Sequence, residues 1–225
     1  PLGLSLASSD GAISGTPTVV SSLATYTVTG TNTGGSVSTT ITIQVNDIAP
    51  IITYSSSSLT LTKGTAISDL IPTSSGGTVI SYSVSPTLPA GLSFDSSTGK
   101  ISGTPTAVTS SALYTITATN TGGTDTASIT IQVNDVQPLI GYTPNSIILS
   151  KGAAMSTASP TLYGSGTPVS WSVSPSLPAG ISLDTSTGDI TGTPTAITAS
   201  TVYTITATNT GGSDTATLTI VVNDA

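Results

Sequence analysis

Acid–base chemistry in this chain of 225 residues would have to rest mainly on aspartate and lysine. The sequence has ten Asp and three Lys, and it has no His, Cys, Glu or Arg. General acid–base catalysis near neutral pH usually depends on His, or on a Glu, Lys or Cys whose pKa is shifted toward 7. The aspartates also recur from one repeat of the chain to the next, which favours a structural role. We therefore expect no catalytic residue and no enzymatic activity.

Two of the aspartates stand inside the longest repeated phrase. Asp95 lies in LPAGLSFDSSTGKISGTPT at residues 88–106, and Asp184 lies in LPAGISLDTSTGDITGTPT at residues 177–195. A short carboxylate followed by Ser, Thr and Gly can accept hydrogen bonds from the backbone amides of its own turn. The matching place near the N-terminus holds Ala7, so the carboxylate is not needed in every copy. The phrase predicts a tight corner in the chain.

The charge balance excludes two classes of partner. The formal net charge is −7 with only three lysines, so the chain has no basic stripe that could displace counterions from nucleic acid. The same charge gives no attraction to anionic lipid. No apolar run approaches the ~18 residues that a membrane-spanning helix needs. We expect neither nucleic-acid binding nor membrane insertion in this segment.

The chain is repetitive throughout. Thr-Pro occurs at 16–17, 104–105 and 193–194, and Asn-Asp occurs at 46–47, 134–135 and 223–224, so both recur at spacings of 88 and 89 residues. These spacings predict three units: a first unit at 1–47, a second at 48–135 and a third at 136–225. Pro1 aligns with Pro89, so the first unit matches only the C-terminal half of a repeat. We expect either a longer array or strands supplied by a neighbouring chain.

Alternating apolar and polar residues indicate the type of structure. LYTITATNTGG (113–123) and DTASITIQVND (125–135) both place apolar residues at every second position, as half-buried antiparallel strands do. The intervening segment Asn120–Gly123 is typical of a hairpin turn, and its two glycines tolerate a positive φ. A unit of this length is close to the ~100 residues of an Ig-like sandwich. We predict an all-β protein of tandem Ig-like Greek-key β-sandwiches with about seven strands each.

The repeated phrase, followed by YTITATNTGGTDTASITIQVND, resembles the Putative Ig (He_PIG) repeat and is similar to the dystroglycan-type cadherin-like domain. The resemblance covers the second and third units and all of the shorter first unit. It implies a β-sandwich fold, tandem arrays, and prokaryotic cell-surface or secreted proteins. In that family such domains serve as stalks, spacers, adhesin modules and wall-associated appendages. The fold alone does not determine which of these roles applies.

The resemblance also suggests a calcium site. Cadherins bind Ca²⁺ between domains through acidic motifs, and QVNDIAP (44–50) and QVNDVQP (132–138) resemble a reduced form of their linker. Ca²⁺ takes six to eight oxygen ligands, several of them carboxylates, but Glu is absent here. The other interpretation is a linker turn without metal, and no other cofactor is expected. The candidate ligands are Asn46, Asp47, Asn134 and Asp135, together with Asp95, Asp184 and Asp69.

A covalent cross-link is a further alternative. Some surface Ig-like domains join a Lys side chain to an Asn side chain beside an acidic residue. Lys63 and Lys151 occupy matching places in LTLTKG and IILSKG, and either could meet Asn134 or Asn223. Each bond would lower the intact mass by one ammonia.

The aromatic residues are expected in the core. Tyr82 and Trp171 occupy the same position in one strand, which is a central core position in Ig-like sandwiches. Tyr26, Tyr114 and Tyr203 share the start of the penultimate strand. Aromatic residues make up 4% of the chain, which is too few for an exposed sugar-binding platform.

The low charge favours a structural role. Only 6% of the residues are charged, against about 25% in an average domain, so the outer faces of the sheets should be rich in Ser and Thr. Such faces lack the charges that normally keep sheet proteins apart. We expect an extracellular rod, fibre or surface appendage that polymerises with neighbouring repeats or identical subunits through strand sharing or lateral packing. The alternative is an adhesin stalk, stiffened by Ca²⁺ or not, that presents a tip for a surface or host ligand.

Overall fold

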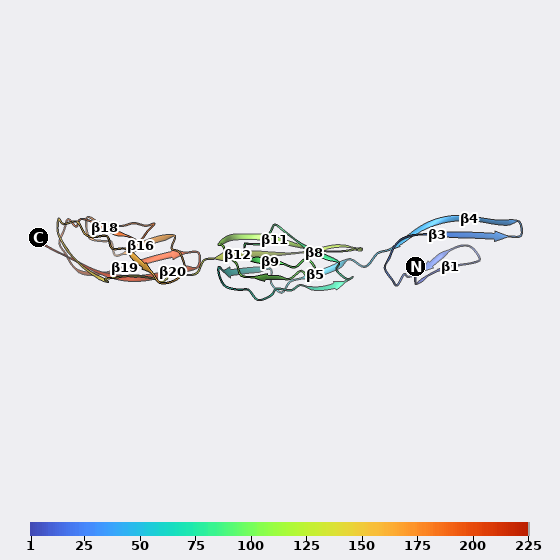
Figure 1. Cartoon of the computed structure of the whole chain (residues 1–225), viewed down its shortest axis with the longest axis horizontal. Helices are drawn as coiled ribbons and strands as arrows, with labels where there is room; N and C mark the ends of the chain where they lie inside the picture. Colours follow the sequence, from blue (N-terminus) through green and yellow to red (C-terminus); the bar gives the residue numbers. More distant parts are fainter. Residues whose placement is uncertain (225) are drawn as a thin grey trace.

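The computed structural model of the protein describes residues 1–224, and in this range the chain forms twenty strands and no helix. Because these residues form no helix, none of their segments is a helix long and apolar enough to cross a membrane. Figure 1 shows three bodies of strands in a row along one long axis, with the C-terminus at one end. The architecture is therefore that of an extended all-β tandem array.

The second unit is a sandwich built on one larger sheet. Its four strands lie in the order β6-β12-β11-β8, with β6 parallel to β12 and the other pairs antiparallel. Two pairs of short strands, β5–β7 and β9–β10, complete it, and β5 packs on β11 and β12. The strands are β5 (Pro50–Thr53), β6 (Ser58–Thr62), β7 (Thr73–Gly76), β8 (Ser81–Ser85), β9 (Leu92–Phe94), β10 (Ile101–Gly103), β11 (Thr109–Asn120) and β12 (Gly123–Asn134).

The third unit repeats this topology. Its larger sheet has the order β14-β20-β19-β16, and its short pairs are β13–β15 and β17–β18. Both units have eight strands, slightly more than the seven expected, because the repeated phrase forms a hairpin of its own, β9–β10 or β17–β18. The strands are β13 (Ile140–Tyr142), β14 (Ser146–Ser150), β15 (Pro160–Leu162), β16 (Ser170–Ser174), β17 (Ile181–Leu183), β18 (Ile190–Gly192), β19 (Thr198–Asn209) and β20 (Gly212–Asn223).

Residues 1–47 form only part of this arrangement. They contain β1 (Leu4–Leu6), β2 (Ile13–Gly15), β3 (Ser21–Asn32) and β4 (Gly35–Val45), which correspond to β9–β12 of the second unit. No counterparts of β5–β8 cover the inner face of β3 and β4 within this segment. Tyr26 is consequently 37% exposed, whereas its counterparts Tyr114 and Tyr203 are 4% and 2% exposed. The prediction that Tyr26 belongs to a core is wrong for these residues, because the strands that would bury it are missing.

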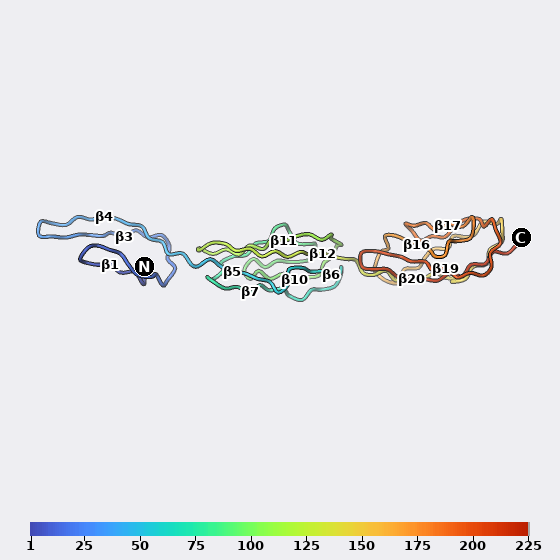
Figure 2. The backbone as a smooth tube through the Cα atoms, turned by 180° about the vertical axis from the view of Figure 1, so that it is seen from behind, coloured from blue at the N-terminus to red at the C-terminus, as the bar shows by residue number. Residues whose placement is uncertain are grey.

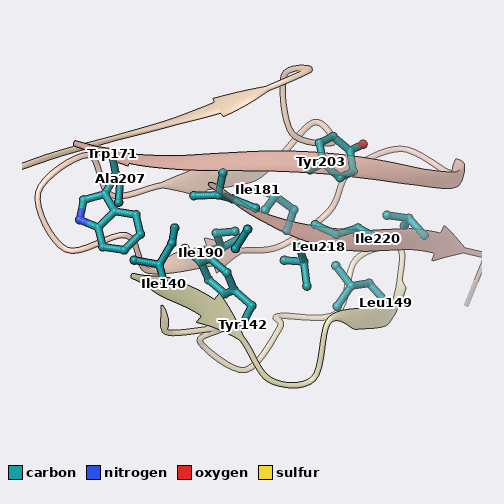
Figure 3. Packing of buried hydrophobic residues seen from close by; sticks show 13 residues of the cluster. Ile140, Tyr142, Leu149, Trp171, Ile181, Ile190, Tyr203, Ala207, Leu218 and Ile220 are labelled. Atoms are coloured by element: carbon teal, nitrogen blue, oxygen red, sulfur yellow. The ribbon is translucent and has the colours of Figure 1, made fainter. Parts of the chain in front are cut away.

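The alternation seen in the sequence sets the core of the second and third units. In β12, Ile129, Ile131 and Val133 are fully buried, while the residues between them point to the other face of the sheet. Tyr82 and Trp171, the matched aromatics of β8 and β16, are also buried. In the third unit, Trp171 lies near Ala207 and Ile140 at one end of the core (Figure 3).

Candidate functional site

The repeated phrase forms a turn whose aspartate stays at the surface. Asp95 Oδ1 accepts hydrogen bonds from the Ser97 amide at 2.8 Å, the Ser97 hydroxyl at 2.6 Å and the Thr98 amide at 3.3 Å. Asp184 accepts the same bonds from Ser186 and Thr187. The carboxylates therefore close their own turns, as the pattern predicts. The Ser97 hydroxyl and amide favour the ionised form and lower the pKa of Asp95 to about 2.

The turns should make the fold sensitive to acid. The Ser186 hydrogen bonds lower the pKa of Asp184 in the folded state. Its stabilising effect is therefore present above the unfolded-state pKa of about 3.9 and is lost as the pH falls through the lower folded-state pKa. We expect Asp184→Ala to flatten the decline in melting temperature of the third unit below pH ~4, measured by Trp171 fluorescence. Asp95→Ala, in the second unit, is the control and should leave this decline unchanged.

The predicted linkers are held by the units that follow them. The Asp47 amide donates to Thr121 Oγ1 at 3.0 Å, and Asn120 Nδ2 donates to the Ile48 carbonyl at 2.7 Å. The Asp47 carboxylate accepts from the Ile48 amide at 2.8 Å and from the Thr78 amide at 3.0 Å. The linker is thus bonded to the tip of the β11–β12 hairpin and to the loop between β7 and β8.

The second junction has the same arrangement. The Asp135 amide donates to Thr210 Oγ1 at 2.8 Å, and Asn209 Nδ2 donates to the Val136 carbonyl at 2.7 Å. The Asp135 carboxylate accepts from the Val136 amide at 2.9 Å and the Thr167 amide at 3.3 Å. We call each set a junction clasp; the two sets are Asp47, Ile48, Gly77, Thr78 and Asn120–Gly122, and Asp135, Val136, Gly166, Thr167 and Asn209–Gly211.

Four glycines allow the linker to lie this close. A Cβ on Gly122 or Gly211 would overlap the carbonyl oxygen of Asp47 or Asp135, and one on Gly77 or Gly166 would overlap that of Ile48 or Val136. Gly122 and Gly211 do not have a positive φ, so the hairpin itself does not require glycine there. The hairpin motif of the sequence predicts only a turn at Gly122. Its recurrence at Gly211, and that of Gly-Thr at 77–78 and 166–167, was the available signal for a close contact.

The Asp135 carboxylate also contacts the preceding unit. Lys63 Nζ lies 3.5 Å from Asp135 Oδ1, and the Lys63 backbone amide donates to the Asn134 carbonyl. Desolvation by burial raises the pKa of Asp135, but the amides of Thr167 and Val136 and the Lys63 ammonium together outweigh it, so the pKa is lowered. Asp135 is therefore an ionised group that links residues on both sides of the junction.

The structure does not bring the candidate calcium ligands together. The side-chain oxygens of Asn46 and Asn134 accept hydrogen bonds from Gln44 and Gln132, and those of Asp47 and Asp135 accept from amides of the clasps. Asp95 and Asp184 lie in separate turns, and Asp69 pairs with Lys100. Within residues 1–224, no group of three or more acidic side chains is placed to hold a metal. The donor set therefore does not fit a cadherin-like Ca²⁺ site.

Calcium should consequently not stabilise the chain. A ligand present at 100 times its Kd stabilises a folded protein by about 2.7 kcal/mol, which would be visible as a shift of several degrees in melting temperature. We expect the melting curves in millimolar CaCl₂ and in EDTA to coincide. A rise with CaCl₂ that EDTA reverses would contradict this and would restore the calcium interpretation.

The proposed Lys–Asn cross-link is not arranged at Lys63. Its Nζ contacts Asp135, whereas the Asn134 side chain is bonded to Gln132. The candidate site is therefore the junction clasp, a noncovalent contact that holds the linker on the following unit.

Comparison with known proteins agrees with this architecture. The family described as Putative Ig domain (He_PIG) matches residues 1–46, 49–134 and 137–223. The chain belongs to the He_PIG family. Among solved structures, this He_PIG chain is similar to the N-terminal four Ig domains of Dscam1 isoform 9.44, with a TM-score of 0.50, 15% identity, and coverage of 80% of this chain and 47% of that one. It also matches the titin I-band fragment I67–I69 with a TM-score of 0.45, 19% identity, and coverage of 90% and 75%. The likeness concerns the tandem Ig-like fold.

Curated relatives of the He_PIG chain are named "Serine-rich adhesin for platelets". The protein of Staphylococcus aureus strain MRSA252 is 33% identical over 196 residues, which cover 85% of this chain and 14% of that protein. The protein of strain MW2 is also 33% identical over 196 residues and is covered over 8% of its length. The chain thus spans a small part of the relatives it matches.

Proposed function

We propose that the chain is a stiff, non-catalytic spacer segment of an extracellular cell-surface adhesin. Its units would hold a distal binding region away from the cell wall, and its partners along the rod would be neighbouring repeats. The name of the curated relatives supports the adhesin context. The repeated junction clasp is the observation that carries the proposal.

A flexible linker leaves its backbone groups to water and has few contacts with either domain. Here Asp47 and Asp135 lie just after β4 and β12. Each of them, and the residue that follows it, is hydrogen-bonded to the hairpin tip of the next unit. Bending of the chain after Asp47 or Asp135 would break several of these bonds, each worth about 0.5–1.5 kcal/mol net. The clasps therefore favour a rod over freely jointed beads.

Solution scattering and electron microscopy at low protein concentration test this proposal. Twelve-residue strands such as β11 span about 40 Å, so each unit adds about that length to the rod. We expect straight particles with one dominant length and a narrow distribution of the angle between the second and third units. Particles that bend freely at residues 135–137 would overturn the proposal.

Strand sharing is a second candidate for this protein. The inner side of β3 and β4 leaves a hydrophobic hollow lined by residues that include Leu4, Ile13, Tyr26, Val28 and Ile43. In the second unit β5 packs on the corresponding face while β6 and β8 extend the sheet, and β13, β14 and β16 have the same places in the third unit. The hollow would accept such strands, and an assembly made in this way should be lost in Ile43→Asp.

A further inference from the structure

The larger sheet of each full unit has one face made almost entirely of Ser and Thr. In the second unit, cross-strand rows run through Ser83, Thr117 and Thr126, and through Ser85, Thr115 and Ser128. The third unit repeats them through Ser172, Thr206 and Thr215, and through Ser174, Thr204 and Thr217. We call this surface the hydroxyl face. Its residues alternate along each strand with the buried residues of the core.

The hydroxyl face carries no charge in either full unit. Of its four strands in the second unit, only β12 contains a charged residue, Asp125, and its carboxylate accepts a hydrogen bond from the Ile52 amide of β5. Asp214 of β20 likewise accepts from Ile140 of β13. The remaining Asp and Lys residues of the two full units lie at the junctions or in loops. The net charge of −7 is thus excluded from this surface.

Exposed aliphatic side chains lie at one end of the same face. Leu113 is 58% exposed beside Thr130, and Val202 is 57% exposed beside Thr219. Ile148, on the neighbouring strand β14, is 74% exposed. Charged residues interspersed on a protein surface normally limit association through such exposed apolar groups. This sheet has no such protection, although the rest of the molecule is acidic.

We propose that the hydroxyl face is the surface by which a second copy of this chain packs laterally, an inference that rests on the proposed rod. Two copies repel each other where their aspartates meet, whereas two hydroxyl faces can meet without this repulsion. Thr methyl groups and the aliphatic end supply apolar contact, while the hydroxyls rotate to bond across the interface. Stacked sheets pack about 10 Å apart with nearly aligned strands, which parallel rods allow.

The area of one hydroxyl face explains why lateral packing needs several units along the rod. With strands about 4.8 Å apart and a rise of about 3.4 Å per residue, one hydroxyl face covers about 550 Å². Stable interfaces bury about 800 Å² on each partner, so one pair of units binds weakly, and several pairs along a rod bind more strongly. In Figures 1 and 2, β11–β12 and β19–β20 lie along opposite sides of the rod, so successive units can engage copies on different sides.

Sedimentation velocity over a range of protein concentrations tests the proposal. The face variant combines Thr126→Lys and Thr215→Lys, which are matched exposed positions on the hydroxyl face, each in a cross-strand row of Ser and Thr. The control combines Ser93→Lys and Ser182→Lys, which are matched exposed positions on the opposite small sheets and change the net charge equally. We expect the wild type and the control to associate, and the face variant to associate about tenfold or more weakly.

Three outcomes would overturn the proposal. The wild type could remain monomeric at all concentrations, both double variants could weaken association equally, or only Ile43→Asp could abolish it, which would indicate strand sharing. Melting curves of each variant verify that the units stay folded. The stiffness of the rod is measured separately at low concentration, so lateral packing can fail while the proposed spacer function stands.

Discussion

Replacing Gly188 with Ala is expected to destabilise the third unit by about 3 kcal/mol. Gly188 has a φ of +81°, which costs an L-residue about 1 kcal/mol or more. Its Cβ would also lie 2.7 Å from the Trp171 ring, and overpacking of a core side chain costs about 1–3 kcal/mol. Trp171 is buried and cannot move without disturbing its neighbours in the core.

The chain provides both the probe and the control for this prediction. Trp171 is its one Trp, so fluorescence during urea unfolding reports on the third unit alone. Gly152 has the same φ of +81° but no heavy atom within 4 Å of its Cβ position, so Gly152→Ala measures the backbone cost without the clash. We expect Gly152→Ala to cost about 1 kcal/mol. Equal losses for the two variants would show that contact with Trp171 contributes nothing.

The second unit offers an independent repetition. Gly99 has a φ of +72°, and its Cβ would lie 2.9 Å from Tyr82 Cδ1, while Gly64 has a φ of +79° and open space. In both full units, therefore, the glycine of the repeated phrase packs against the buried aromatic residue and lets the phrase close over the core. The sequence predicts the turn of the repeated phrase and the buried aromatic residue separately but not their contact, because their spacing along the chain gives no information about which loop folds over which ring.

Local patterns predicted the strands and the turn at Asp95 well, because alternation and turn chemistry depend on near neighbours in the chain. They failed at Tyr26, since burial depends on strands far away in the sequence that residues 1–47 do not contain. They also missed Tyr54 and Tyr142, whose hydroxyls donate to the carbonyls of Gly99 and Gly188. A tyrosine in a short strand, like Tyr142, or directly after one, like Tyr54, indicates burial, but the partner of its hydroxyl is decided by the packing of two sheets.

The Asn-Asp motif, which belongs to the candidate functional site, is a second case in which a local pattern did not predict a contact with residues distant in sequence. The sequence left two interpretations open, a Ca²⁺ ligand between domains or a linker turn, and neither placed the linker against the hairpin tip of the next unit. In the fold, Asp135 is bonded to Thr167 and Thr210, which lie far along the chain in the next unit. The information was distributed over three short motifs, and only the topology places them side by side.

Gly211→Ala should open the second junction without unfolding either unit. Gly211 lies at an exposed hairpin tip and its backbone does not need glycine, so Ala is compatible with the turn. Its Cβ would overlap the Asp135 carbonyl oxygen, which forces the linker out of the clasp. The bonds that Asn209 and Thr167 donate to the linker, and the bond that Thr210 Oγ1 accepts from the Asp135 amide, would then be lost together, at about 0.5–1.5 kcal/mol each.

Spin-label distances can measure this opening because the chain has no native Cys. Labels at Ser102→Cys and Thr191→Cys, on β10 and β18, report the position of the second unit relative to the third. We expect a narrow distance distribution in the wild type and a broad one in Gly211→Ala. Gly34→Ala is the matched control, since Gly34 occupies the same place in the tip of the first unit and its Cβ would meet only Asn32 Oδ1 at 3.3 Å. An unchanged distance distribution in Gly211→Ala would mean that a feature other than the clasp aligns the two units. Broadening in Gly211→Ala alone would show that the stiffness of the spacer depends on the close contact between the Asp135 carbonyl and Gly211.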